Sequence, residues 1–339
     1  MMTKKIAIIG TGGTIAGQGA SDTDLTGYTA GVLPLEEIIS SVPGVRDYGP
    51  FVCNQFCNIE SSDITLFQWV RLSKLVQKCV DNDDIAGVVI THGTDSMEET
   101  AYFLHLTVHT DKPIVITGSM RPAGVVSADG PINLLQAIQV ARTPESYNKG
   151  VLVVMNGYID GARDVTKMNT TNVATFGSPN AGHLGIVQDG IAQYYMCPLR
   201  KHTMESEFGL PEDDDLPRVE ILTCYAGIEE IMGLAIVATN PSGLILAGLG
   251  HGTIPQPIRK VTSNLPIPLK KLQFFGLKKP ILPNSLKSFW NTGMVMTMNK
   301  RTIYTLPKLR IPQKARILLM LALQKERTCK DLERIFKEY

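Results

Sequence analysis

The stretch KKIAIIGTGGTIAG, residues 4–17, decides the fold of the larger part of the chain. A continuous apolar run passes directly into a glycine-rich turn, which predicts a strand buried on both faces and then a tight turn. Similar runs return at AGVVITHGTDS (86–96), KPIVITGS (112–119) and KGVLVVMN (149–156). Amphipathic stretches lie between them. Residues 4 to about 156 are therefore predicted to form a doubly wound α/β fold with a mostly parallel sheet.

The chain is predicted to hold two domains of unequal size. Residues 1–198 form the expected N-terminal domain, and the polar, acidic and proline-bearing stretch 199–217 is typical of a linker. Residues 218–339 are expected to form a smaller C-terminal α/β domain that ends in two amphipathic helices. Thr328 is a good N-cap for the last of these helices, with Asp331 three residues further on.

The composition excludes several classes of protein. With 339 residues, 44% of them apolar, the chain can bury a large core. Its uncharged apolar runs are far shorter than the roughly 20 residues of a membrane span, and the apolar stretch after Lys5 is too short for a signal peptide. We expect no membrane partner and a cytoplasmic location. The six cysteines and six histidines lack the spacing of a metal site, so no metal is expected.

The turn from Gly10 to Gly17 is the first candidate for chemistry. A dinucleotide-binding loop is one interpretation, but Ile15 stands where the GxGxxG pattern needs its third glycine, and no P-loop lysine follows. The turn instead presents the hydroxyls of Thr11 and Thr14, with backbone N–H groups, at the carboxyl end of a strand. Such a hydroxyl beside N–H donors suits nucleophilic attack with an oxyanion hole.

The stretch from Thr91 to Met97, THGTDSM, is the second candidate. Capping of the following helix would explain Thr94, Asp95 or Ser96 without any catalytic role. However, this turn also follows a buried strand, and the carboxyl ends of parallel strands meet at one edge of a sheet. Two threonine-bearing turns are therefore expected to lie close together, which favours an active site.

A threonine hydroxyl is a weak nucleophile, so it needs a neighbour that takes its proton. The polar, glycine-rich stretch 17–31 offers Tyr28 and is suited to act as a lid. Lys167 lies in a polar, hydroxyl-rich loop and is a second such neighbour, although a solvated surface lysine is the simpler interpretation.

Several motifs together resemble bacterial L-asparaginases of the high-affinity type: TGGTIAG (11–17), HGTDSMEETAYF (92–103), SMRP (119–122), RDVTKMNTT (163–171) and PQKARILLMLAL (312–323). The resemblance assigns catalysis to Thr14 as the acylated nucleophile, Tyr28 as the lid tyrosine, and a Thr94–Asp95–Lys167 group. It assigns substrate binding to Ser61, Ser62, Thr94, Asp95 and Ser119. Ser61 would grip the substrate's α-carboxylate, and Asp95 its α-ammonium.

The resemblance implies hydrolysis of L-asparagine to L-aspartate and ammonia through a threonyl ester, with no cofactor and no nucleic-acid partner. It also implies a homotetramer with active sites between subunits, and leaves a periplasmic location as an alternative. Two other functions stay open. Ser62 stands where many relatives have Gln or Glu, so the enzyme could be a mixed glutaminase–asparaginase. A catalytically impaired homologue that only binds the amino acid is the other.

One segment departs from the family. Residues 231–325 carry no acidic residue, and within them about 255–311 show no family resemblance, repeated prolines and poor helical periodicity. His251 stands where the family has an asparagine-like position that serves the neighbouring subunit's site. A pair of compensating reading-frame errors is one hypothesis for this segment, and a genuine basic binding segment is the other. Sequencing of the coding DNA separates them.

Overall fold

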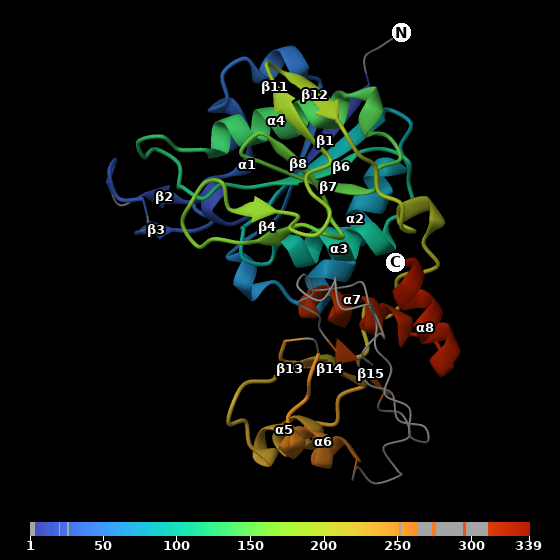
Figure 1. Cartoon of the computed structure of the whole chain (residues 1–339). Coiled ribbons are helices and arrows are strands. Elements are labelled where there is room, and N and C mark those ends of the chain that lie inside the picture. Colours follow the sequence, from blue (N-terminus) through green and yellow to red (C-terminus); the bar gives the residue numbers. More distant parts are fainter. Residues whose placement is uncertain are drawn as a thin grey trace. The chain divides into compact units, whose positions relative to one another are not determined.

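The computed structural model describes residues 4–19, 21–25, 27–250, 252–263, 273–275, 294–295 and 311–339. Two compact units are present, Met1–Leu210 and Pro211–Tyr339 (Figure 1). The division between them falls inside the stretch 199–217 that was expected to be a linker, while the domain boundaries themselves stay predictions. His251 and most of the atypical segment 255–311 lie outside the described residues.

The first unit is built on a sheet of eight strands in the order β12-β11-β8-β7-β6-β5-β1-β4. Five neighbouring strands are parallel: β4 (Phe51–Ile59), β1 (Lys5–Gly12), β5 (Ile85–Thr91), β6 (Ile114–Thr117) and β7 (Val151–Met155). The other three are antiparallel: β8 (Tyr158–Gly161), β11 (Gly185–Gln188) and β12 (Ile191–Tyr194). The predicted mostly parallel α/β sheet is confirmed.

Helices cover both faces of this sheet, as its continuous apolar strands require. The helices α1 (Leu35–Ser40) and α4 (Gly130–Arg142) bury one face, with α4 packed across β5, β6 and β7. The helices α2 (Leu66–Val80) and α3 (Met97–Thr107) lie on the other side of the sheet (Figure 1). The central strands are almost fully buried. Loops that follow the parallel strands are therefore held on a rigid support.

The second unit is a smaller α/β unit. Its strands β13 (Val219–Thr223), β14 (Gly243–Ala247) and β15 (Gln273–Phe275) are parallel, and β16 (Met294–Val295) pairs antiparallel with β14. The helices of this unit are α5 (Glu230–Ala238), α6 (Gln256–Ser263), α7 (Pro312–Ala322) and α8 (Cys329–Glu338). Helix α7 packs on β13 and β14. Within the described residues, no helix has the length and apolar character to span a membrane.

Two local predictions in this unit have different outcomes. Thr328 caps α8 as expected, because its side chain accepts from the Asp331 N–H and Asp331 reaches back to the Thr328 N–H. The expectation of poor helical order is wrong at the start of the atypical segment. Residues Gln256–Ser263 form α6, and Ile258 and Val261, three residues apart, are buried.

Candidate active site

Three turns meet at the carboxyl edge of the parallel sheet. Strand β1 leads into the 3₁₀ turn η1 (Thr14–Ala16), β5 leads through residues 92–96 into α3, and β4 leads into the turn η3 (Ser61–Asp63). Strand β1 pairs with both neighbours, so Gly10 lies beside Thr91 and Gly12 beside Ile59. The two threonine-bearing turns therefore leave adjacent strands at the same level, as the sequence predicted.

Glycines allow these turns to touch. Gly13 has a φ of +80°, and a Cβ added there would lie 2.3 Å from the Cα of Gly93. A Cβ on Gly93 would lie 2.7 Å from the hydroxyl oxygen of Ser61. No side chain fits at such distances, and the positive φ of Gly13 is itself unfavourable for other residues. The glycines in TGGT and HGT thus bring the backbones of the first two turns together and allow the Ser61 side chain to lie against Gly93.

Thr14 and Tyr28 form the first polar pair of the site. The Thr14 hydroxyl lies 2.6 Å from the Tyr28 hydroxyl, and Thr14 is only 7% exposed. Tyr28 begins the short strand β3 (Tyr28–Thr29), which pairs with β2 (Gln18–Gly19). The tyrosine is 37% exposed. The pairing of β2 with β3 therefore places a phenol against the Thr14 hydroxyl.

Thr94, Asp95 and Lys167 form the second polar group. The Lys167 ammonium donates to the Thr94 hydroxyl at 2.8 Å and pairs with the Asp95 carboxylate at 2.6 Å. The Lys167 side chain is only 18% exposed, whereas that of Asp95 is 69% exposed. Because an ammonium only donates, the Thr94 oxygen accepts this bond and its own proton is left to donate elsewhere. The solvated surface lysine is thus the wrong interpretation of Lys167.

Helix capping does not account for the HGTDS turn. Ser96 is the N-cap of α3, but its side chain makes no capping hydrogen bond. Its hydroxyl donates instead to the carbonyl of Ser61 at 2.5 Å. Thr94 and Asp95 are committed to Lys167, as described above. The polar residues of this turn are therefore arranged around the other turns and Lys167, rather than around the helix end.

Ser61 connects the third turn to the HGTDS turn. Its hydroxyl oxygen accepts from the N–H of Asp95 at 3.1 Å and from that of Ser96 at 3.4 Å. Both bonds use the oxygen, so the hydroxyl proton can point elsewhere. Ser61 is 6% exposed and lies in the wall of the same pocket as Thr14. A carboxylate in the pocket would be a suitable acceptor for that proton.

Sequence reasoning missed two side chains of the HGTDS region. Glu98 is buried in the first turn of α3, and its Oε2 accepts from the main-chain N–H of Lys167 at 2.6 Å. His92 is buried, with Nδ1 2.7 Å from the Gly93 carbonyl oxygen and Nε2 3.0 Å from the Thr100 hydroxyl. A carbonyl only accepts, so Nδ1 carries the proton. Burial lowers the pKa of His92 to about 4 and keeps the ring neutral near pH 7.

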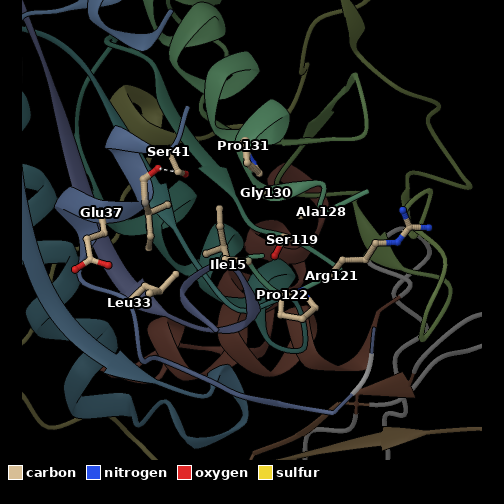
Figure 2. A pocket seen from close by; sticks show the side chains of 12 residues that line it. Ile15, Leu33, Glu37, Ser41, Ser119, Arg121, Pro122, Ala128, Gly130 and Pro131 are labelled. Carbon is tan, nitrogen blue, oxygen red and sulfur yellow. Dashed lines mark hydrogen bonds between the residues drawn. The ribbon is translucent and has the colours of Figure 1, made fainter. Parts of the chain in front are cut away.

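One pocket, with a volume of about 380 Å³, collects most of the predicted residues. Its walls include Thr14, Tyr28, Ser61, Thr94, Asp95 and Lys167. Ser62 is exposed and is not part of these walls. Ser119 lines a separate cavity of about 170 Å³ beside Ile15, together with Leu33 and Pro122 (Figure 2). The structure thus brings together six of the eight predicted side chains and leaves Ser62 and Ser119 apart.

Two further observations bear on the chemistry available. Within the described part of the chain, no group of three His, Cys, Asp or Glu side chains is placed to hold a metal ion. All six cysteines are free thiols, and burial raises the pKa of Cys57 and Cys224 to about 11. The polar residues that line the pocket therefore carry hydroxyls, the carboxylates of Glu60 and Asp95, the Lys167 ammonium and the Arg121 guanidinium.

Comparisons with known proteins show which family the chain belongs to. Residues 5–199 match the family model described as "Asparaginase, N-terminal". The chain is 39% identical to L-asparaginase 2 of Bacillus subtilis, over 98% of this chain and 86% of that protein. It is 38% identical to a glutaminase-asparaginase of Pseudomonas aeruginosa, over 98% of this chain and 90% of that protein.

A solved structure is similar throughout. The crystal structure of a protein named "Probable Cytoplasmic L-asparaginase", from Campylobacter jejuni, has a TM-score of 0.87 and 37% sequence identity, and covers 99% of this chain and 100% of that one. These relatives, together with the α/β fold, place the chain in the class of α/β amidohydrolases. The chain belongs to the asparaginase family.

Proposed function

We propose that the protein is an L-asparaginase that hydrolyses L-asparagine to L-aspartate and ammonia. The observation that carries the proposal is the convergence of two threonine hydroxyls on one pocket, each bonded to a group that can exchange its proton. Relatives named L-asparaginase and glutaminase-asparaginase match almost the whole chain and support the same reaction.

The proposed reaction is acyl transfer in two steps. The Thr14 oxygen attacks the side-chain amide carbon and gives its proton to the Tyr28 hydroxyl at 2.6 Å. The phenol passes its own proton to the amide nitrogen, so the C–N bond breaks and ammonia leaves. Water then attacks the threonyl ester, and the same proton path runs in reverse to release aspartate and restore Thr14.

The second group is proposed to bind and activate the substrate. The Asp95 carboxylate, which is the exposed partner of the ion pair, attracts the α-ammonium. The free hydroxyl proton of Ser61 donates to the α-carboxylate. Thr94 donates its proton to the oxygen of the reacting carbonyl, and the Lys167 ammonium behind it stabilises the negative charge that develops there.

Ammonia release from asparagine by the wild type and by Thr14→Ala tests the proposal. Removal of such a nucleophile typically lowers kcat by about 10⁴-fold or more. Thr14→Ser, which restores a hydroxyl at the same position, should retain measurable turnover. A folded wild type that binds asparagine but releases no ammonia would support the binding-only homologue instead.

A mixed glutaminase–asparaginase is the second candidate, favoured by the P. aeruginosa relative of nearly the same identity. One extra methylene in a pocket is worth only about 1–3 kcal/mol in discrimination. The values of kcat/KM on asparagine and glutamine, measured side by side, decide between the two.

The assembly and the location are also proposals. A homotetramer follows from the family resemblance, and light scattering coupled to size-exclusion chromatography measures it directly. A cytoplasmic location is supported by the name of the C. jejuni protein and by the six free thiols, which are typical of a reducing compartment. Cell fractionation with an antibody against the protein tests the location.

A further inference from the structure

Glu98 is an acidic side chain that the proposed reaction leaves without a role. It lies in the first turn of α3, four residues after Thr94, and is 8% exposed. A carboxylate is costly to bury unless hydrogen bonds satisfy it. Its Oε2 accepts from the main-chain N–H of Lys167 at 2.6 Å, a short bond of the kind that ionised acceptors make. The buried carboxylate thus has a specific partner in the site.

The strand that carries Lys167 has little support from the main sheet. Strand β9 (Thr166–Lys167) is two residues long and pairs with β10 (Phe176–Gly177) in a separate two-stranded sheet. The eight-stranded sheet that aligns the threonine turns therefore does not set the position of Lys167. Contacts outside that sheet must do so, and the Glu98 bond ties the backbone of β9 directly to the helix that follows the HGTDS turn.

Residues 94–98 contact Lys167 at its main-chain N–H and at its side-chain ammonium. Glu98 binds its main-chain N–H, while Thr94 and Asp95 bind its ammonium at 2.8 and 2.6 Å. A lysine side chain has four rotatable bonds and loses much rotamer freedom when hydrogen bonds fix its ammonium. We infer that Glu98 is a positioning residue, which fixes the backbone of Lys167 so that the ammonium stays between Thr94 and Asp95.

Two variants separate the position of the acceptor oxygen from the charge. Glu98→Gln keeps an oxygen at the same reach and removes the charge. Glu98→Asp keeps the charge and withdraws the oxygen by one methylene. Glu99→Asp shortens the next acidic side chain of the same helix turn and is the matched control. If Glu98 acts through its contact with Lys167, the Gln variant should behave like the wild type and the Asp variant should not.

Kinetics give the first readout, and this part rests on the proposed function. A misplacement of about 1 Å in a catalytic group can cost about 10²-fold in rate. We expect kcat on asparagine to fall by about 10²-fold in Glu98→Asp, with a smaller change in KM and a lower melting temperature, because the hydrogen bond to Lys167 is lost. Glu98→Gln and Glu99→Asp should stay close to the wild type. A loss in Glu98→Gln equal to that in Glu98→Asp would overturn the inference, as would wild-type kcat in Glu98→Asp.

Lysine acylation gives a readout that needs no activity. In a short pulse of acetic anhydride followed by mass spectrometry, Lys167 should be labelled faster in Glu98→Asp than in the wild type. Lys112, which donates to the carbonyls of Val80 and Asn82 at 2.7 and 2.8 Å, is the internal control and should not change. Unchanged labelling of Lys167 overturns the inference even if the proposed function is correct.

The labelling experiment tests the role of Glu98 even if the proposed function is wrong. A wild type without activity on either amide removes the function, and the rate of Lys167 labelling alone then decides the role of Glu98. If Glu98→Asp does not fold, Glu98→Ala, which removes the acceptor oxygen, takes its place. Faster Lys167 labelling in that variant supports the role of Glu98, and unchanged labelling contradicts it.

Discussion

The two threonine centres of the pocket differ in how their partners are held. Tyr28, the partner of Thr14, comes from a hairpin of two-residue strands and is 37% exposed. Lys167, the partner of Thr94, is fixed by Thr94, Asp95 and Glu98, and its side chain is 18% exposed. The second centre is therefore a prebuilt charged group. The first is a neutral pair that depends on where the hairpin lies.

Loss of the charged group should be the most damaging change to the second centre. Lys167→Met keeps most of the length of the side chain but leaves Asp95 and Thr94 without their cation. We expect kcat/KM on asparagine to fall by about 10³-fold, measured by ammonia release. Lys112→Met, which removes an ammonium bound to two carbonyls outside the pocket, is the control and should leave kcat unchanged. A Lys167→Met enzyme with the turnover of the wild type would show that the second centre is not catalytic.

Loss of the phenol tests the first centre. Tyr28→Phe keeps the ring that packs beside Gly17 and removes the hydroxyl that contacts Thr14. Proton transfer by a positioned group is worth about 10²-fold or more, so kcat should fall by about 10²-fold with little change in thermal stability. Tyr158→Phe, at a tyrosine of similar exposure, is the control. If Tyr28→Phe were as damaging as Lys167→Met, the two centres would be equally important.

Acid should lower the unfolding free energy through the HGTDS turn and not through the Thr14 turn. Residues 10–17 contain no ionisable side chain, whereas the HGTDS turn holds His92. The ring has a pKa of about 4 in the folded protein, against 6.5 as its ordinary value. The unfolded chain therefore binds the extra proton first as the pH falls through 6.5, and stability is lost from there down to about pH 4. Between pH 7 and pH 5 this group should cost about 2 kcal/mol of unfolding free energy.

Urea denaturation at the two pH values measures this cost in the wild type and in His92→Asn. Burial also lowers the pKa of His202, which acts in the same direction in both proteins. The difference between the two proteins isolates His92. An equal loss of stability in both would mean that His92 does not resist protonation in the folded state.

The convergence of the two centres could be predicted from sequence, because continuous apolar strands imply a parallel sheet and its carboxyl ends share one edge. The pairing of Thr14 with Tyr28 and of Thr94 with Lys167 could not be derived in this way. Both partners come from loops whose paths the strand pattern does not fix. Their residue types made Tyr28 and Lys167 candidates, and the resemblance to a family assigned each to its threonine. The geometry then placed both beside their threonines.

Other residues of the site gave no usable signal. An acidic residue in the first turn of a helix has an ordinary explanation in the helix dipole, so Glu98 did not stand out. His92 looks like any buried histidine until its carbonyl partner is known. The positions of Ser62 and Ser119 depend on side-chain direction in a turn, which one dihedral angle can reverse. Sequence reasoning therefore predicts which turns meet, and the backbone geometry decides which side chains face the pocket.

The turn after β6 is a fourth strand end, and its Ser119 can be compared with Ser61 in the turn after β4. Ser119 there is fully buried, and its hydroxyl has no hydrogen-bond partner among the described residues, whereas Ser61 accepts from two N–H groups. A buried hydroxyl without a partner is destabilising, so Ser119→Ala should be neutral or raise the unfolding free energy by up to about 1 kcal/mol. Ser61→Ala leaves two N–H groups unsatisfied and should lower it by about 1–3 kcal/mol. Urea denaturation of both variants measures the difference in unfolding free energy. A Ser119→Ala protein that is as unstable as Ser61→Ala would contradict this prediction. It would show that the Ser119 hydroxyl has a partner, such as a buried water, in the small cavity.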